Sequence, residues 1–211
     1  MERKIEVRHV SLEINADFES FTQTLEKSLG RFDSSLHKDL ETDPRSVEKR
    51  LEASAGEEGL MLFNVQEHGK LLNIVGSSRK AKQYVLGNPL IAVSMTRHDI
   101  RAALYAPLRV LVYEADDQST RIEFLQPSSL FGQFDNPDVT TEARSLDTKL
   151  TNLIKKAERS AVRFVSAFSR SKMIKPAHSV VRKSDVRDPP GRVQAVVAAH
   201  ETARGLGGGR Y

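Results

Sequence analysis

Two short segments of the sequence place residues that could do chemistry in connections between secondary-structure elements. In the first, Glu67, His68 and Gly69 set an imidazole beside a carboxylate. Because histidine titrates near neutral pH, it can act as an acid, a base or a metal ligand, and a neighbouring carboxylate can orient it. The alternative interpretation is a histidine that is only hydrogen-bonded within a turn.

The second segment is Gly87-Asn88-Pro89, which follows a short apolar run. Asn88 can cap a helix and Pro89 can occupy its first turn, so residues 90–97 are expected to be helical. The free backbone amides at such a helix start attract anionic groups. The alternative is a capped helix that binds nothing.

Other catalytic signatures are missing from the sequence. It contains no serine nucleophile elbow, no phosphate-cradling glycine loop and no histidine pair at helical spacing. The glycines at 205–209 are not followed by a lysine and a helix, so they indicate a flexible terminus. The chain has no cysteine, which excludes disulfides, thiolate nucleophiles and cysteine-ligated metals. No metal and no cofactor is expected.

The first half of the chain shows strand and helix signals in alternation. Residues 5–14 are expected to form a strand, bulged near His9, and Asp17 to cap a helix over residues 18–29. An Asp-Pro pair predicts a second helix start, giving a more polar surface helix within residues 43–56. A buried strand is then expected at residues 60–63.

The middle of the chain is dominated by strands. The spacing of apolar side chains in residues 71–75 fits either a short helical turn or a strand. A short strand is expected at residues 83–86. Apolar and polar side chains alternate in the same way in residues 108–113 and 120–125, and a polar turn lies between the two segments. This pattern predicts a hairpin. Leu108, Val110 and Val112 share one face of that hairpin.

The strongest periodic signal covers residues 137–168, where apolar side chains recur at steps of three and four. Such a helix would be about 48 Å long, whereas a compact body of this size is roughly 40 Å across. The helix must therefore kink, project or pack on a partner. A homodimer is one hypothesis, and a helix that simply spans one sheet is the other.

The net charge of +4 is unevenly distributed along the chain. Residues 170–211 carry 9 basic and 3 acidic side chains, whereas residues 1–169 carry 23 and 25. This distribution argues against a basic nucleic-acid-binding core and leaves only weak, non-specific binding through a mobile basic tail. The N-terminal residues lack a signal-peptide pattern and the apolar runs are too short to span a membrane, so a cytoplasmic protein is expected.

Three ordered motifs resemble the family called domain of unknown function 302. They are the run Tyr84 to Ala92 with its Gly-Asn-Pro, the strand entry Pro107 to Glu114, and Gln126-Pro127-Ser128. The resemblance covers roughly residues 5–157. The chain departs from the family in having Glu67 in place of Asp, Ala106-Pro107 in place of Leu-Pro, and an insert at residues 43–56. The resemblance implies an α+β fold with a curved antiparallel sheet, helices on one face, the order β-α-β(4)-α and a long C-terminal helix.

These observations lead to one domain at residues 1–169, a tail at 170–211, and three functional hypotheses. The first is a domain that binds a small molecule in a cleft between the sheet and the helices. That cleft would be bordered by a buried or half-buried His68 and by Gly87, Asn88, Pro89, Arg109 and Tyr113. The second is an enzyme of small-molecule metabolism in which His68 is the general base and Glu67 orients it. The third is binding of nucleic acid or an acidic partner through the tail.

Overall fold

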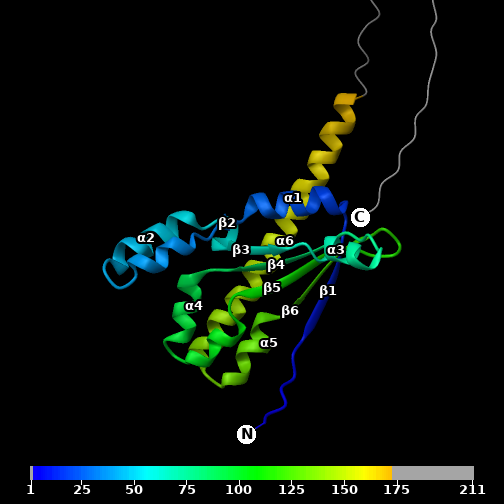
Figure 1. Ribbon diagram of the computed structural model, residues 1–211. Coiled ribbons are helices and arrows are strands. Elements are labelled where there is room, and N and C mark those ends of the chain that lie inside the picture. The colour runs from blue at the N-terminus through cyan, green and yellow to red at the C-terminus, as the bar shows by residue number, and fades with distance from the viewer. Residues whose placement is uncertain (1, 173–211) are drawn as a thin grey trace, which may run out of the picture. The chain divides into compact units, whose positions relative to one another are not determined.

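The protein has a mixed α+β fold built on one six-stranded sheet (Figure 1). The computed structural model describes residues 2–172, with side chains as far as residue 163 in the last helix. The strands lie in the order β1-β6-β5-β4-β3-β2, and neighbouring strands are antiparallel except for the short parallel pair β2 and β3. The strands are β1 (His9–Ile14), β2 (Gly30–Arg31), β3 (Met61–Gln66), β4 (Ala81–Gly87), β5 (Leu108–Glu114) and β6 (Thr120–Leu125). The predicted α+β class is confirmed.

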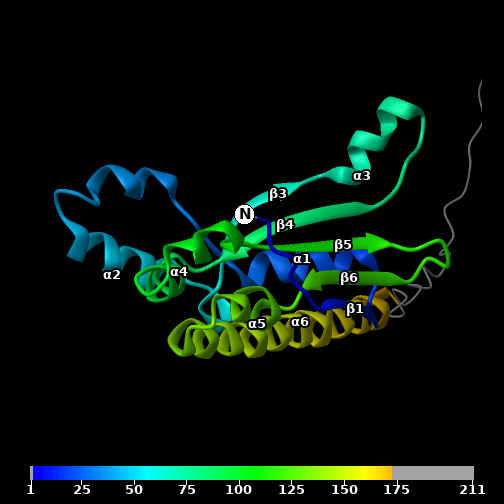
Figure 2. The same cartoon turned by 90° about the horizontal axis from the view of Figure 1, so that it is seen from below.

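Helices α1 and α6 pack against each other and lie together on one face of the sheet (Figures 1 and 2). The α3 helix lies at the tip of the β3–β4 connection, and α4 and α5 lie toward the opposite end of these strands (Figure 2). The helices are α1 (Phe18–Ser28), α2 (Pro44–Ser54), α3 (His68–Leu71), α4 (Pro89–Thr96), α5 (Pro127–Phe131) and α6 (Pro137–Lys172), joined by short 3-10 turns.

Side-chain caps explain why three of the helices begin where they do. Asp17 accepts a hydrogen bond from the backbone nitrogen of Ser20 at 3.0 Å. Asp43 accepts one from Ser46 at 3.1 Å, and a proline occupies the first helical position. A capping carboxylate satisfies one of the backbone donors that a helix start leaves unpaired. These two predicted starts, and the Asn88 start described below, are confirmed.

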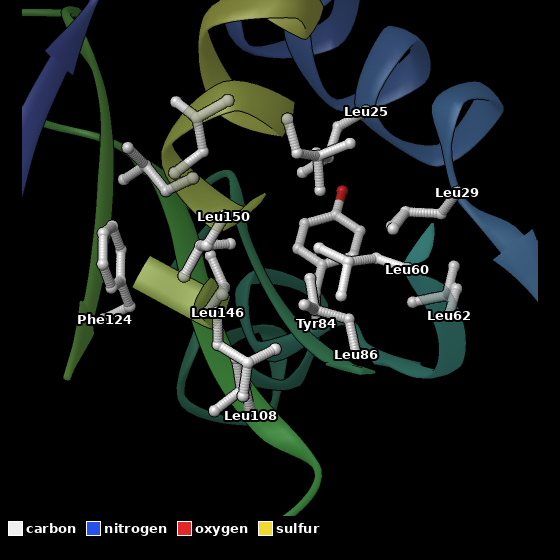
Figure 3. Packing of buried hydrophobic residues seen from close by; sticks show 14 of the residues in the cluster. Leu25, Leu29, Leu60, Leu62, Tyr84, Leu86, Leu108, Phe124, Leu146 and Leu150 are labelled. Atoms are coloured by element: carbon white, nitrogen blue, oxygen red, sulfur yellow. The ribbon is translucent and has the colours of Figure 1, made fainter. Parts of the chain in front are cut away.

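The core lies between the sheet and the pair α1 and α6 (Figure 3). Leu25 of α1 and Leu150 of α6 are each 1% exposed and meet the inward face of β4 and β5. Tyr84 of β4 is also fully buried, and its hydroxyl donates a hydrogen bond to Glu26 at 2.9 Å. Burying one such large side chain stabilises the fold by about 1.5–3 kcal/mol.

Some boundaries differ from the sequence prediction. The β1 strand begins at His9, so residues 5–8 are not part of a strand. Residues 68–75 form a short helix and a 3-10 turn, so of the two alternatives for residues 71–75 the helical one is correct. The last helix is 36 residues long, or about 54 Å. Residues 170–172, predicted to begin the basic tail, belong to this helix, and the rest of the predicted tail lies outside the described residues. None of the helices described here has the length and apolar character that a membrane span requires.

Candidate functional site

A largely apolar cavity opens beside the Gly-Asn-Pro turn at residues 87–89. Its volume is about 320 Å³, which lies at the lower end of the range for small-molecule sites. Six separate parts of the chain contribute to it, from the β2 end to α6. We call it the turn cavity; it is lined by Phe32, His37, Phe63, Gly87, Asn88, Pro89, Ile91, Ala92, Met95, Thr96, Ala103, Ala106, Pro107, Leu108, Phe131 and Leu146.

Asn88 holds the wall of the turn cavity together rather than pointing a free amide into it. Its Oδ1 accepts a hydrogen bond from the backbone nitrogen of Leu90 at 2.8 Å, which caps α4. Its Nδ2 donates to the carbonyl oxygen of Gly59 at 2.7 Å, in a turn where Glu58 and Gly59 both have positive φ. Asn88 therefore ties the start of α4 to the turn that precedes β3.

One side of the turn cavity is aromatic. The rings of Phe32 and Phe63 stack with centroids 4.5 Å apart, and the His37 ring lies 5.5 Å from Phe32. Phe63 reaches this position because the register of β3 against β4 shifts between Leu62 and Asn64, leaving Phe63 as an extra residue. Sequence reasoning missed these aromatic residues, since each is typical of an ordinary core position.

The polar groups that line the turn cavity are few. His37 and Thr96 carry side-chain donors or acceptors that make no hydrogen bond with any residue the structure describes. No acidic, lysine or arginine side chain lines the cavity among the described residues. Such a lining suits an uncharged apolar molecule that has one or two hydrogen-bonding groups.

His68 lies far from the turn cavity, so the expected shared cleft is wrong. The β4 strand separates them: His68 is next to its first residue and Asn88 follows its last. Seven strand residues place the two ends about 20 Å apart. His68 is also exposed, whereas the shared cleft required it to be buried or half-buried. The cause is topological, because β3 and β4 pair as a hairpin and the connection between them must lie at its tip.

The neighbours of His68 also have other partners. The Glu67 carboxylate lies 3.4 Å from the Lys70 ammonium and 3.7 Å from that of Lys82, rather than orienting the imidazole. Gly69 is required sterically, since a Cβ there would lie 2.0 Å from the carbonyl oxygen of Arg79. The Glu-His-Gly motif therefore shapes the hairpin tip.

Arg109 and Tyr113 lie on the face of the sheet opposite α1 and α6. Because Leu108 and Val110 are buried on the covered face, the alternation of the strand turns Arg109 and Tyr113 the other way. The predicted placement of both in a cleft between sheet and helices is therefore wrong. His68 and Tyr113 do border one shallow hollow on this open face.

Tyr113 belongs to a polar cluster with residues of β1 and β6. Its hydroxyl donates to Glu123 at 2.7 Å, and the same carboxylate is 3.0 Å from the His9 ring and 3.3 Å from the Ser11 hydroxyl. The hydrogen bond to Glu123 raises the pKa of Tyr113, and the same bond lowers the pKa of Glu123. The polar groups of this cluster therefore satisfy one another's hydrogen bonding.

Within residues 2–172, no group of three or more side chains is arranged to hold a metal ion.

Comparisons with known proteins agree on the family and the fold. The sequence profile of the family described as "Domain of unknown function DUF302" matches residues 36–157. A crystal structure of an uncharacterized conserved DUF302 protein from Bacillus stearothermophilus superposes with a TM-score of 0.52 at 16% identity. The match covers 71% of this chain and 97% of the other, and it concerns the fold alone. No curated protein sequence matches the chain.

Proposed function

The chain belongs to the DUF302 family, a family of domains of unknown function, and from that premise we propose that it binds a small, largely apolar molecule in the turn cavity. The observation that carries this proposal is the cavity itself. Small-molecule sites are hollows of about 300–1,000 Å³ lined mainly by apolar and aromatic side chains with a few polar groups. The turn cavity, at about 320 Å³ between α4 and the sheet end, has that size and that kind of lining.

The lining favours a planar or ring-containing ligand. The stacked pair Phe32 and Phe63 is half-buried and presents ring surface at the cavity wall. Aromatic rings gain about 0.5–1.5 kcal/mol from stacked or edge-on contacts beyond the burial of their area. The His37 ring and the Thr96 hydroxyl can each form a hydrogen bond to one polar group of the ligand.

Binding is a better proposal than acid-base catalysis because His37 is the one titratable side chain of the lining among the described residues, and no carboxylate lines the cavity to orient its ring. A general acid or base must lie within hydrogen-bond reach of the atom it serves. His68, which the sequence suggested for that role, is at the other end of β4. The ligand would thus be held by shape, apolar contact and one or two hydrogen bonds.

The proposal can be tested with N-phenyl-1-naphthylamine, a neutral aromatic probe whose fluorescence rises on transfer to an apolar site. The full chain is titrated as wild type, as Ala92→Leu and as Val93→Leu. Ala92 lines the turn cavity, so a larger side chain there occupies the space of the ligand. Val93 is the next residue on α4, is 58% exposed and is not part of the lining, which makes it the matched control.

We expect the wild type and Val93→Leu to bind the probe with the same affinity and Ala92→Leu to lose at least tenfold. Equal binding by all three proteins would contradict the proposal, as would no binding by the wild type. Native mass spectrometry of the freshly purified full chain is a complementary measurement, because a retained ligand adds a defined mass. That mass should be lost in Ala92→Leu and kept in Val93→Leu.

A further inference from the structure

A second hollow, which the proposed function does not use, lies at the start of β5 and shares Ala106, Pro107 and Leu108 with the wall of the turn cavity. It lies where Val85 of β4 pairs with Arg109 of β5, beside the 3-10 turn Ile100–Tyr105. We call it the Arg109 hollow; its volume is about 350 Å³ and it is lined by Gln66, Val85, Leu104, Tyr105, Ala106, Pro107, Leu108, Arg109, Leu125 and Leu130.

Apolar side chains surround Arg109 in this hollow. Val85 lies directly across from it on β4, and Leu125 comes from β6. Leu104, which forms part of the rim, is 77% exposed, and Leu125 is 38% exposed. Exposed leucines of this kind around a cation form a surface that could bury the apolar part of a ligand.

The charge of Arg109 has no counterpart within the hollow. The lining contains no Asp or Glu, and the Arg109 guanidinium makes no hydrogen bond or ion pair with any residue that the structure describes. By contrast, Arg121, on the same face, lies 3.5 Å from Asp117, and Arg79 lies 3.2 Å from Asp116. Glu123, which pairs with Leu111 two residues along β5 from Arg109, accepts a hydrogen bond from the Tyr113 hydroxyl.

From this arrangement we propose that the Arg109 hollow is a binding site for a small organic carboxylate with an apolar body. A guanidinium presents parallel N–H donors that match a carboxylate in a bidentate geometry. The leucines and the valine around it would cover the alkyl or ring part of the same molecule. The ligand class differs from that of the turn cavity, whose lining has no cation among the described residues.

Isothermal titration calorimetry on the full chain can test this site with three probes. Octanoate has both the charge and the apolar body, 1-octanol has the body alone, and inorganic phosphate has the charge alone. The variant Arg109→Gln removes the cation at an exposed position. The matched control is Arg121→Gln, which removes a paired cation from the same face but from outside the hollow.

We expect octanoate to bind the wild type and Arg121→Gln equally, and Arg109→Gln at least tenfold more weakly, since the carboxylate loses its hydrogen bonds to a charged donor. Octanol should bind the wild type at least tenfold more weakly than octanoate does, and phosphate should not bind detectably. Leu104→Ser should weaken octanoate several-fold, because it removes part of the apolar rim.

Several results would overturn the site. One is equal octanoate affinity in Arg109→Gln and the wild type. Another is an equal loss of octanoate affinity in Arg109→Gln and Arg121→Gln, which would indicate that the net positive charge of the face, rather than Arg109 itself, attracts the carboxylate. Tight binding of phosphate alone would show that no apolar body is needed. Loss of octanoate binding in Ala92→Leu with retention in Arg109→Gln would move the ligand to the turn cavity.

Discussion

Replacing Asn88 by alanine tests whether the Gly-Asn-Pro motif is structural or part of a ligand site. The side chain makes two hydrogen bonds, one to the Leu90 nitrogen at 2.8 Å and one to the Gly59 oxygen at 2.7 Å. Loss of a capping side chain costs about 1 kcal/mol, and loss of a further internal hydrogen bond costs about the same. Asn88→Ala should therefore lower the free energy of unfolding by about 2 kcal/mol.

A second substitution separates the two bonds. Asn88→Asp keeps an oxygen that can cap α4, but it removes the donor that reaches the carbonyl of Gly59. Its carboxylate would then face that carbonyl without a proton between them. We expect Asn88→Asp to lose about 1 kcal/mol at neutral pH, roughly half the loss of the alanine variant.

Urea unfolding at 25 °C, followed by circular dichroism, measures both variants. With a denaturant slope of about 2 kcal/mol/M, the alanine variant should shift the midpoint down by about 1 M with the slope unchanged. The folded Asn88→Ala protein should still bind the probe at saturating concentration, because the Asn88 amide is already hydrogen-bonded within the protein and does not contact the ligand. An Asn88→Ala protein as stable as the wild type but unable to bind the probe would refute this account of the motif.

Three further predictions concern the core and the hairpin tip. Burial, together with the nearby Glu26 carboxylate, raises the pKa of Tyr84. The contribution of Tyr84 to the free energy of unfolding is therefore full below about pH 10 and falls as the pH rises above it. This loss should be absent from Tyr84→Phe in unfolding titrations. Leu150→Ala should lower the free energy of unfolding by about 3 kcal/mol in urea, since this fully buried side chain would leave a cavity. Gly69→Ala should lower the thermal midpoint by several degrees, because its Cβ would overlap the carbonyl oxygen of Arg79.

Each of these predictions has a clear contrary result. An equal alkaline loss in the wild type and in Tyr84→Phe would mean that other groups control the alkaline transition. A loss below 1 kcal/mol in Leu150→Ala would contradict the packing of α6 against the sheet. An unchanged melting temperature in Gly69→Ala would show that the hairpin tip can relax, and that the glycine is not a steric requirement.

The parts of the fold that follow from local signals could be predicted from the sequence. Asp17, Asp43 and Asn88 are side-chain caps, and each acts on backbone donors two or three residues away. The hairpin of β5 and β6 follows from alternation over a few residues. Such signals depend on neighbours along the chain, so one sequence is enough to read them.

The candidate site could be predicted only in part. Gly87, Asn88 and Pro89 do line a cavity, but its aromatic wall depends on a bulge at Phe63 and on the packing of Phe32 from a distant segment. Neither has a local signature in the sequence. Two errors could have been avoided: strand alternation already placed Arg109 opposite Val110, and a β3–β4 hairpin already placed residue 68 at the far end from residue 88.

The most direct test of ligand binding in the turn cavity uses methyl NMR of the full chain labelled with ¹³C at its methionine methyl groups. Met95 lines the cavity and is 1% exposed, whereas Met61 is also buried but does not line it, lying behind the cavity wall where it pairs with Gly87. On titration with N-phenyl-1-naphthylamine, the Met95 signal should shift with saturation and by several times more than the Met61 signal. Saturable binding of the probe with no change at Met95 would contradict the account.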